Sequence, residues 1–198
     1  MASTLNLKHI LESKTHFGER VVTDQKVLKN IVARLKEMGY RIVLTQGVYD
    51  LIHEGHALYL EAARAHGDIL IVGVDSDELT KIRKGPERPI VPQSERLKML
   101  VHLRHVDLVT LREASHDIGD LIRLVEPDVL IVSKSTGDFT SKMVKEYKPF
   151  CGKIITLPPQ ATTSTSARIR LLAIEGAEKL AREINKLTEQ FISNIRKS

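Results

Sequence analysis

The sequence predicts a doubly wound α/β fold, in which a parallel sheet carries helices on both faces. Short apolar, β-branched runs alternate along the chain with longer segments of helical periodicity, which is the pattern of successive βαβ units. The runs are apolar at nearly every position, as expected of strands that are buried on both faces. In sheets of this kind, ligands bind at the carboxyl ends of the strands.

The first well-marked helix begins after Thr23-Asp24, which we interpret as its N-cap, and ends at Gly39. Its apolar residues recur at helical spacing, and they are Val27, Ile31, Leu35 and Met38. A shorter candidate helix precedes it at residues 5–13.

The remaining elements follow in order. The predicted strands are 41–45, 68–74, 106–111, 128–133 and 153–158. The predicted helices between them are 56–66, 94–104 with Ser94 as N-cap, and 116–125. A further helix opens at 165–176, and a charged amphipathic helix continues from it to the C-terminus.

Composition limits the classes of protein that fit. The 198 residues are 42% hydrophobic and 28% charged, without an apolar run of the length that a membrane span needs. The first residues lack the apolar core and cleavage site of a signal peptide. The single cysteine, Cys151, cannot form an internal disulfide or a multi-cysteine zinc site. We therefore expect a cytoplasmic protein with no membrane partner.

The net charge favours anionic partners. Lys and Arg number 30 against 25 Asp and Glu, which gives +5, and such a balance suits phosphorylated substrates or nucleic acid. Aromatic residues make up only 4% of the chain and Trp is absent, so a surface for stacking bases is not expected. A basic, non-catalytic module that binds nucleic acid is the alternative from another class. It explains the charge but not the motifs described next.

The strongest motif is GVYDLIHEGH at 47–56, directly after the first strong strand. His53 and His56 are three residues apart, so at the start of a helix their side chains share one face. Gly55 allows phosphate oxygens to approach the backbone, and the helix N-terminus adds free N–H groups. The pattern favours a polyphosphate site over two surface histidines. The spacing is too short for the zinc-binding H-E-x-x-H pattern.

Two further segments suit phosphate. KIRKGPERP at 81–89 places Lys84 and Arg88 among four cations around a Gly-Pro turn, and such a loop can close on a polyphosphate. ATTSTSARIR at 161–170 is rich in hydroxyl groups and runs into a helix, whose first N–H groups can cradle phosphates. An ordinary solvated loop and simple helix capping are the respective alternatives.

The three motifs together resemble the HxGH nucleotidylyltransferases, over residues 26–176 or so. This superfamily includes glycerol-3-phosphate cytidylyltransferase, the heptose-phosphate nucleotidylyltransferases, FAD synthetase and phosphopantetheine adenylyltransferase. The chain is most similar to the heptose-phosphate adenylyltransferase and glycerol-phosphate cytidylyltransferase branch. That branch shares the stretches GDILIVGVDSD at 67–77, KGPERPI at 84–90 and RLKML at 96–100.

The resemblance implies a function. A nucleoside monophosphate, AMP rather than CMP by a small margin, would pass from an NTP to a small phosphorylated acceptor such as a sugar or polyol phosphate. Pyrophosphate would leave, in a reaction that depends on positioning and cations. Mg²⁺ would be held by the phosphates, not by protein side chains alone. A homodimer is implied as well, and nucleic acid is an unlikely partner.

The resemblance also assigns roles to residues. The implied catalytic residues are His53, His56, Lys84 and Arg88. The implied nucleotide- and phosphate-binding residues are Gly47, Val48, Tyr49, Asp50, Gly55, Ser164, Thr165, Ser166 and Arg168. The implied acceptor-binding residues are Asp77, Arg96 and Lys134. For Asp50 a helix-capping turn is the alternative, and for Arg96 a salt bridge to Glu95 or Glu87.

Two departures from the branch leave the acceptor and the choice of ATP or CTP open. The stretch VSKSTGDF at 132–139 is two residues longer than the branch's V-K-G-G-D-Y, and Val48-Tyr49 replaces its Cys-Phe. The longer stretch looks like V-S-x-x-T of the phosphopantetheine adenylyltransferases, so a phosphopantetheine- or flavin-type adenylyltransferase is the alternative enzyme. Class I aminoacyl-tRNA synthetases share the HxGH logic, but this chain is short for their anticodon-binding part.

For the organisation of the chain we predict three parts. They are an N-terminal appendage at 1–22, a nucleotidylyltransferase domain at 23–176 and a C-terminal helix at 177–198.

Overall fold

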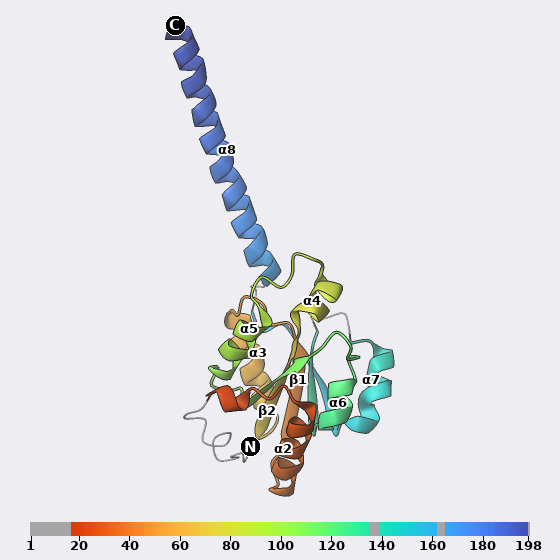
Figure 1. Ribbon diagram of the computed structural model, residues 1–198. Coiled ribbons are helices and arrows are strands. Elements are labelled where there is room, and N and C mark those ends of the chain that lie inside the picture. The colour runs from red at the N-terminus through yellow and green to blue at the C-terminus, as the bar shows by residue number, and fades with distance from the viewer. Residues whose placement is uncertain (1–16, 135–138, 162–164, 198) are drawn as a thin grey trace. The chain divides into compact units, whose positions relative to one another are not determined.

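The protein folds around a five-stranded parallel sheet with helices on both faces (Figure 1), which confirms the predicted doubly wound, Rossmann-like fold. The computed structural model describes residues 17–134, 139–161 and 165–197. The strand order is β3-β2-β1-β4-β5. The strands are β1 (Ile42–Gly47), β2 (Ile69–Asp75), β3 (Leu108–Arg112), β4 (Val129–Ser133) and β5 (Lys153–Leu157).

Two apolar cores lie on the two faces of the sheet. Alternate strand residues point to opposite faces, so Ile42 and Leu44 enter one core and Val43 enters the other. Helices α2, α6 and α7 cover the first face, and α3 and α5 cover the second. The helices of this part of the chain are α2 (Gln25–Glu37), α3 (Glu54–Arg64), α4 (Asp77–Lys84), α5 (Gln93–Val101), α6 (Asp120–Val125) and α7 (Ser141–Tyr147).

The strand order reverses between β1 and β4. From β1 the chain proceeds outward through β2 to β3, and it then returns to place β4 and β5 on the other side. At such a reversal the loops that leave the two strands turn to opposite faces of the sheet and open a crevice at the carboxyl ends. The predicted motif at 47–56 leaves β1 at this point.

Helix α2 forms where it was predicted. The Asp24 carboxylate caps it and accepts hydrogen bonds from the backbone N–H groups of Lys26 at 2.8 Å and Val27 at 3.1 Å. Met38, which has the same helical spacing in the sequence, lies beyond the last residue of the helix and is 53% exposed. The buried residues are Leu28, Ile31, Val32 and Leu35.

The sequence pattern did not predict α4 and α7, nor the short 3-10 helix η2 (Lys148–Phe150). Helix α4 is well specified locally, because the Ser76 hydroxyl accepts a hydrogen bond from the N–H of Leu79. The helix carries acidic residues in its first turn and basic residues in its last, as the helix dipole favours. The cations from Lys81 to Lys84 therefore lie on a helix and not in a flexible loop.

Helix α5 begins one residue earlier than predicted. Its N-cap is Pro92, which makes no side-chain capping bond, and Ser94 lies inside the helix. The prediction of Ser94 as the N-cap was wrong, because the Pro92 carbonyl already accepts a helical hydrogen bond from the N–H of Arg96 at 3.0 Å.

Residues before α2 pack along the outer edge of β3. After the 3-10 helix η1 (Phe17–Arg20), Val21 forms a parallel bridge to Val109, and the N–H of Val22 donates to the carbonyl of Val109 at 2.8 Å. The buried Arg20 guanidinium donates to the carbonyls of Val106, at 2.7 Å, and Val101. The helix predicted at 5–13 lies outside the described residues.

The chain divides into two compact units, Met1–Thr162 and Thr163–Ser198. The second is described by one helix, α8 (Thr165–Lys197), where two successive helices were predicted. None of the described helices combines the length and the apolar character needed to cross a bilayer. The predicted boundaries at 22/23 and 176/177 stay predictions.

Candidate active site

The two histidines of the motif lie face to face at the start of α3. His53 is the N-cap of the helix, with extended backbone angles, and its Nδ1 accepts a hydrogen bond from the N–H of Gly55 at 3.1 Å. In the neutral ring this contact puts the proton on Nε2, which becomes the donor. The ring of His56 stacks on that of His53, with centroids 4.0 Å apart and planes inclined by 27°.

Close packing around Gly55 holds this arrangement. A Cβ atom at position 55 would lie 3.0 Å from Cε1 of His53 and 3.2 Å from Cβ of Ala161. Only glycine leaves the His53 ring where it is. The short distance to Ala161 also shows that this first residue of the hydroxyl-rich motif lies against the start of α3.

The turn that leads to the histidines is strained. Tyr49 and Leu51 have φ angles of 54° and 45°, in the left-handed region that residues other than glycine rarely adopt. The Tyr49 ring is buried and lies 5.5 Å from the His56 ring, centroid to centroid. The turn therefore places the Tyr49 ring next to the ring of His56.

His56 is held neutral. Burial and the neighbouring His53 lower its pKa to about 4, although Asp50 acts in the opposite direction. Its Nδ1 is buried and meets no hydrogen-bond partner within the described part of the chain. A buried polar atom without a partner is uncommon in a folded protein, and at a binding site the ligand can supply that partner.

Asp50 joins the histidine turn to the predicted cationic segment. It is 2% exposed, and it accepts hydrogen bonds from the backbone N–H groups of Ile90 and Val91, both at 2.9 Å. Its Oδ2 also forms an ion pair with Nε of Arg88 at 2.9 Å. These contacts, and not a cap on α3, are where the structure places the Asp50 carboxylate. They bring Arg88 next to the predicted site.

Asp77 and Arg96, both predicted to bind the acceptor, pair with each other. Nη2 of Arg96 lies 2.7 Å from Oδ1 of Asp77, not near Glu95 or Glu87, the partners that the sequence suggested. The remaining Arg96 nitrogens donate to the carbonyls of Val91, at 2.9 Å, and Val48. Arg96 is 0% exposed. We call these two residues the Asp77–Arg96 clamp; it ties α4 and α5 to the turn after β1.

The other predicted residues are more dispersed. Lys84 is the exposed last residue of α4, and Lys134 is exposed after β4, where its N–H donates to Leu157. Ser164 lies outside the described residues. Thr165, Ser166 and Arg168 open helix α8 in the second unit. The roles predicted for all of these stay predictions.

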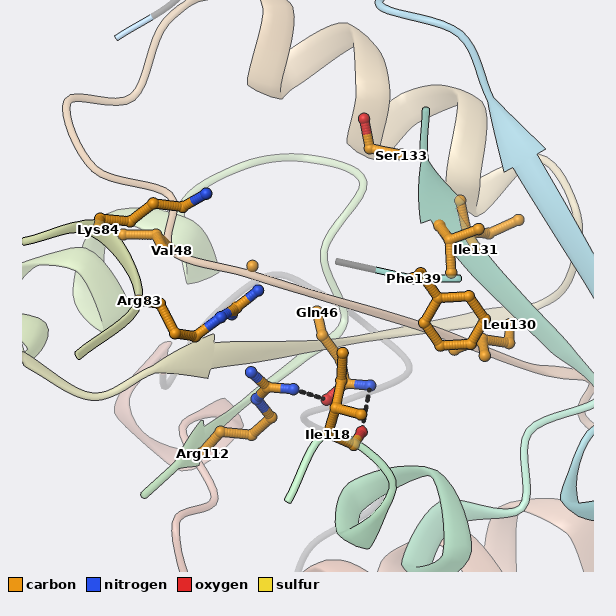
Figure 2. A pocket seen from close by; sticks show the side chains of 12 residues that line it. Gln46, Val48, Arg83, Lys84, Arg112, Ile118, Leu130, Ile131, Ser133 and Phe139 are labelled. Carbon is orange, nitrogen blue, oxygen red and sulfur yellow. Dashed lines mark hydrogen bonds between the residues drawn. The ribbon is translucent and has the colours of Figure 1, made fainter. Parts of the chain in front are cut away.

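A pocket opens at the strand reversal, beside the histidine turn. Its empty space amounts to about 530 Å³, which includes space open to solvent. Figure 2 shows cationic side chains on one side and apolar side chains on the other, with Gln46 between them. The lining residues are Gln46, Gly47, Val48, Arg83, Lys84, Arg112, Ile118, Leu130, Ile131, Val132, Ser133 and Phe139.

The sequence motifs did not predict the polar wall of this pocket. Gln46, Asp75 and Arg112 lie at the ends of three neighbouring strands, and hydrogen bonds link them. A polar or charged residue at the end of an apolar strand was the only signal in the sequence. Gly47, Val48 and Lys84, by contrast, were both predicted and found at the pocket.

Comparison with known protein families identifies the family of this chain. The model of the cytidylyltransferase-like family matches residues 44–171, which span β1, the histidine turn, the pocket and the start of α8. The chain belongs to the cytidylyltransferase-like family.

Curated relatives narrow the similarity. The bifunctional protein HldE of Desulfatibacillum aliphaticivorans is 38% identical over 144 residues, which cover 72% of this chain and 29% of the relative. The HldE protein of Nitratiruptor sp. is 40% identical over 147 residues, covering 72% of this chain and 31% of the relative. The chain thus spans about a third of the length of these relatives.

Solved structures share the fold. The lipopolysaccharide core biosynthesis protein of Thermoplasma volcanium is 27% identical, with a TM-score of 0.53, over 62% of this chain and all of that one. Pantoate-beta-alanine ligase of Francisella tularensis is 15% identical, with a TM-score of 0.54, over 72% of this chain and 67% of that one. The second similarity concerns the fold alone.

Proposed function

We propose that this protein transfers AMP from ATP to the phosphate of a small sugar phosphate and releases pyrophosphate. The stacked His53–His56 pair carries the proposal, because its second ring has a buried nitrogen without a partner in the described chain. The similarity to the HldE proteins and to the lipopolysaccharide core biosynthesis protein supports a sugar phosphate as the acceptor.

In the proposed reaction an oxygen of the acceptor phosphate attacks the α-phosphorus of ATP. A new P–O bond forms as the bond from the α-phosphorus to the β-phosphate oxygen breaks, and pyrophosphate leaves with the electron pair. Nε2–H of His53 donates a hydrogen bond to the phosphates, and Lys84 and Arg88 balance their charge. The chain therefore contributes positioning and positive charge rather than a covalent intermediate.

Mg²⁺ enters this scheme with the nucleotide. The groups near the histidines are imidazoles, amides and cations, which suit phosphate oxygens and not a hard divalent ion. The nearby carboxylate, Asp50, already binds two amides and Arg88. These residues fit a metal ion held by phosphate oxygens, which neutralises part of the triphosphate charge when it is bound.

The histidines provide the direct test. His53→Ala and His56→Ala should each lower turnover by about a hundredfold, the usual scale for losing one donor to the transition state. Pyrophosphate release with ATP, Mg²⁺ and a panel of sugar phosphates measures the change. His105→Ala is the control, because its half-exposed ring pairs with Glu61 near the other end of α3. Near-normal turnover in both site variants would refute the assignment.

The choice of base needs a separate measurement. A site built for adenine leaves buried polar groups unpaired when it holds cytosine, and such mismatches lower the rate strongly. We infer ATP, by resemblance to the heptose-phosphate branch. Comparing kcat/KM for ATP and CTP with one acceptor decides the question, and a preference for CTP would leave the reaction class unchanged.

We further propose that the protein is a homodimer, paired through α8. Ala177, Leu180, Ile184 and Leu187 alternate at spacings of three and four residues, and the last three are 52–65% exposed. Ile and Leu at alternating heptad positions favour a parallel coiled coil of two helices. Sedimentation of the full chain should show a dimer that Leu180→Lys weakens and Lys186→Ala does not. A monomeric wild-type protein would contradict this proposal.

A further inference from the structure

One wall of the pocket contains a chain of polar contacts that no motif explains. It begins at Asp75, the last residue of β2, which is 0% exposed. Asp75 Oδ1 accepts from Nε of Arg112 at 3.0 Å and lies 2.7 Å from Nη2 of the same side chain. Its other oxygen binds Arg83. The carboxylate thereby fixes the plane of the Arg112 guanidinium, which is itself 3% exposed.

Arg112 in turn orients Gln46. Nη1 of Arg112 donates to Oε1 of Gln46 at 2.8 Å, and Nε2 of Gln46 donates to the carbonyl of Ile118 at 3.3 Å (Figure 2). These two contacts distinguish the oxygen from the nitrogen of the amide. If the amide were flipped, its N–H groups would face the N–H of Arg112 and its oxygen would face the carbonyl of Ile118. The Gln46 side chain has one orientation at the pocket surface.

This arrangement is costly for a purely structural purpose. Removing a carboxylate and a guanidinium from water requires free energy that apolar side chains in the same place would not require. Burial and the nearby Arg83 also lower the pKa of Arg112, even though Asp75 raises it. Three adjacent strand ends are nevertheless committed to setting the direction of one amide that lines the pocket.

The oriented amide retains hydrogen-bonding capacity. A glutamine side chain has two N–H donors and two acceptor sites on its oxygen. Ile118 uses one donor and Arg112 uses one acceptor site. One donor and one acceptor remain, which matches a hydroxyl group, since a hydroxyl both accepts and donates. Phe139, which is only partly buried on the facing wall, offers apolar surface to the carbon atoms that carry such a hydroxyl.

We propose that Gln46 is a specificity-determining residue that recognises a hydroxyl group of a polyhydroxylated phosphate acceptor, and that Arg112 and Asp75 are positioning residues that act through it. The proposal rests on the proposed transferase function. It adds to that function the residue that selects the sugar or polyol phosphate and the means of selection, which is hydrogen bonding to a hydroxyl group.

The test separates recognition of hydroxyl groups from phosphate binding. The full-length protein is assayed for pyrophosphate release with ATP and Mg²⁺. Mannose 1-phosphate, glucose 1-phosphate and glycerol 3-phosphate serve as hydroxylated acceptors, and methyl phosphate serves as an acceptor without hydroxyl groups. Gln46→Met keeps the size of the side chain and removes its hydrogen bonds. It should raise KM for the best hydroxylated acceptor about tenfold, the scale of one hydrogen bond.

The same variant should leave KM for ATP and the rate with methyl phosphate unchanged. Arg112→Met should act in the same direction as Gln46→Met, and the double variant should be no worse than Arg112→Met alone, because both remove one unit. Arg64→Met is the matched control. It removes another aspartate–arginine pair, the 2.8 Å contact to Asp107, which lies at the opposite ends of the strands.

Each outcome is decisive. If the wild type uses a hydroxylated acceptor and both variants keep its KM, the role of Gln46 is refuted while the transferase function stands. If the variants raise KM for ATP, methyl phosphate and the hydroxylated acceptor alike, the network is structural and the proposal fails. If the wild type releases no pyrophosphate with any acceptor and either ATP or CTP, the transferase function fails and this inference fails with it.

Discussion

The Asp77–Arg96 clamp and the His53–His56 pair both belong to the predicted site, yet they differ in how their polar atoms are satisfied. The guanidinium of Arg96 is fully buried and finds Asp77 and two carbonyls within the protein. His56 has a buried Nδ1 without a partner in the described chain, and its pKa is lowered to about 4. The first arrangement is complete without a ligand, whereas the second is not.

The difference separates two kinds of buried polar residue. Nearly all buried polar groups in folded proteins are hydrogen-bonded, and those that are not stand out as candidates for function. A complete set of internal partners indicates a residue that holds or positions other groups and needs no ligand of its own. An unpartnered atom at the crevice of a doubly wound sheet indicates a residue that meets a substrate. The acceptor-binding role of Arg96 stays a prediction, and its contacts favour the structural interpretation.

The largest effect is expected at the clamp. Arg96→Met removes a buried guanidinium from the partly exposed Asp77 and leaves the Val48 and Val91 carbonyls without their donor, so it should lower the free energy of unfolding by about 3 kcal/mol. Urea denaturation measures the loss. Lys98→Met, on the exposed side of the same helix, is the control. A variant as stable as the wild type that no longer turns over would mean that Arg96 binds substrate, and the comparison would fail.

A smaller effect is expected from the protonation of His56. Between pH 6.5 and about 4 the unfolded chain protonates this residue and the folded chain does not, so the free energy of unfolding falls as the pH falls through that window. In the His56→Gln variant, the free energy of unfolding should fall less between pH 7 and pH 4.5 than in the wild type, by on the order of 2 kcal/mol. Denaturation at pH 4.5 and pH 7 measures it, with His105→Gln as the control. An unchanged pH profile would show that His56 is not held neutral.

The smallest effect is expected at Gly55. A methyl group there would lie 3.0 Å from Cε1 of His53, so Gly55→Ala should turn the imidazole and lower turnover by about tenfold, as small misplacements of a reacting group do. Its melting temperature should change little, because alanine favours the helix. A large loss of stability with normal turnover would instead show that Gly55 has a structural role, as the Asp77–Arg96 clamp does.

The sequence predicted what local patterns determine. Apolar runs located all five strands, and the spacing of His53 and His56 after the first of them located the helix start that carries both rings. Helix α4 was missed because the cations near Gly85 and Pro86 suggested a loop, although Ser76 is a sound N-cap. Local patterns are therefore sufficient for elements and for motifs within one turn.

What the sequence could not predict depends on the alignment of distant segments. Asp75 and Arg112 meet because β2 and β3 pair in a register that places these two residues opposite each other. The residues next to Asp75 and Arg112 in the sequence do not indicate that register. In the same way, Arg96 was predicted at a helix start, but its burial against Val48 and Asp77 depends on how α5 packs on the turn after β1.

The pairing of Val21 and Val22 with β3 has a consequence for how the chain can be shortened. β3 forms one edge of the sheet, and an uncovered edge strand offers its free backbone groups to other molecules, which promotes aggregation. The N–H of Val22 donates a hydrogen bond to the carbonyl of Val109, and Arg20 holds the segment in place by donating to the carbonyl of Val106. A chain that began at residue 23 would keep every residue proposed for the reaction, but it would expose this edge and tend to aggregate.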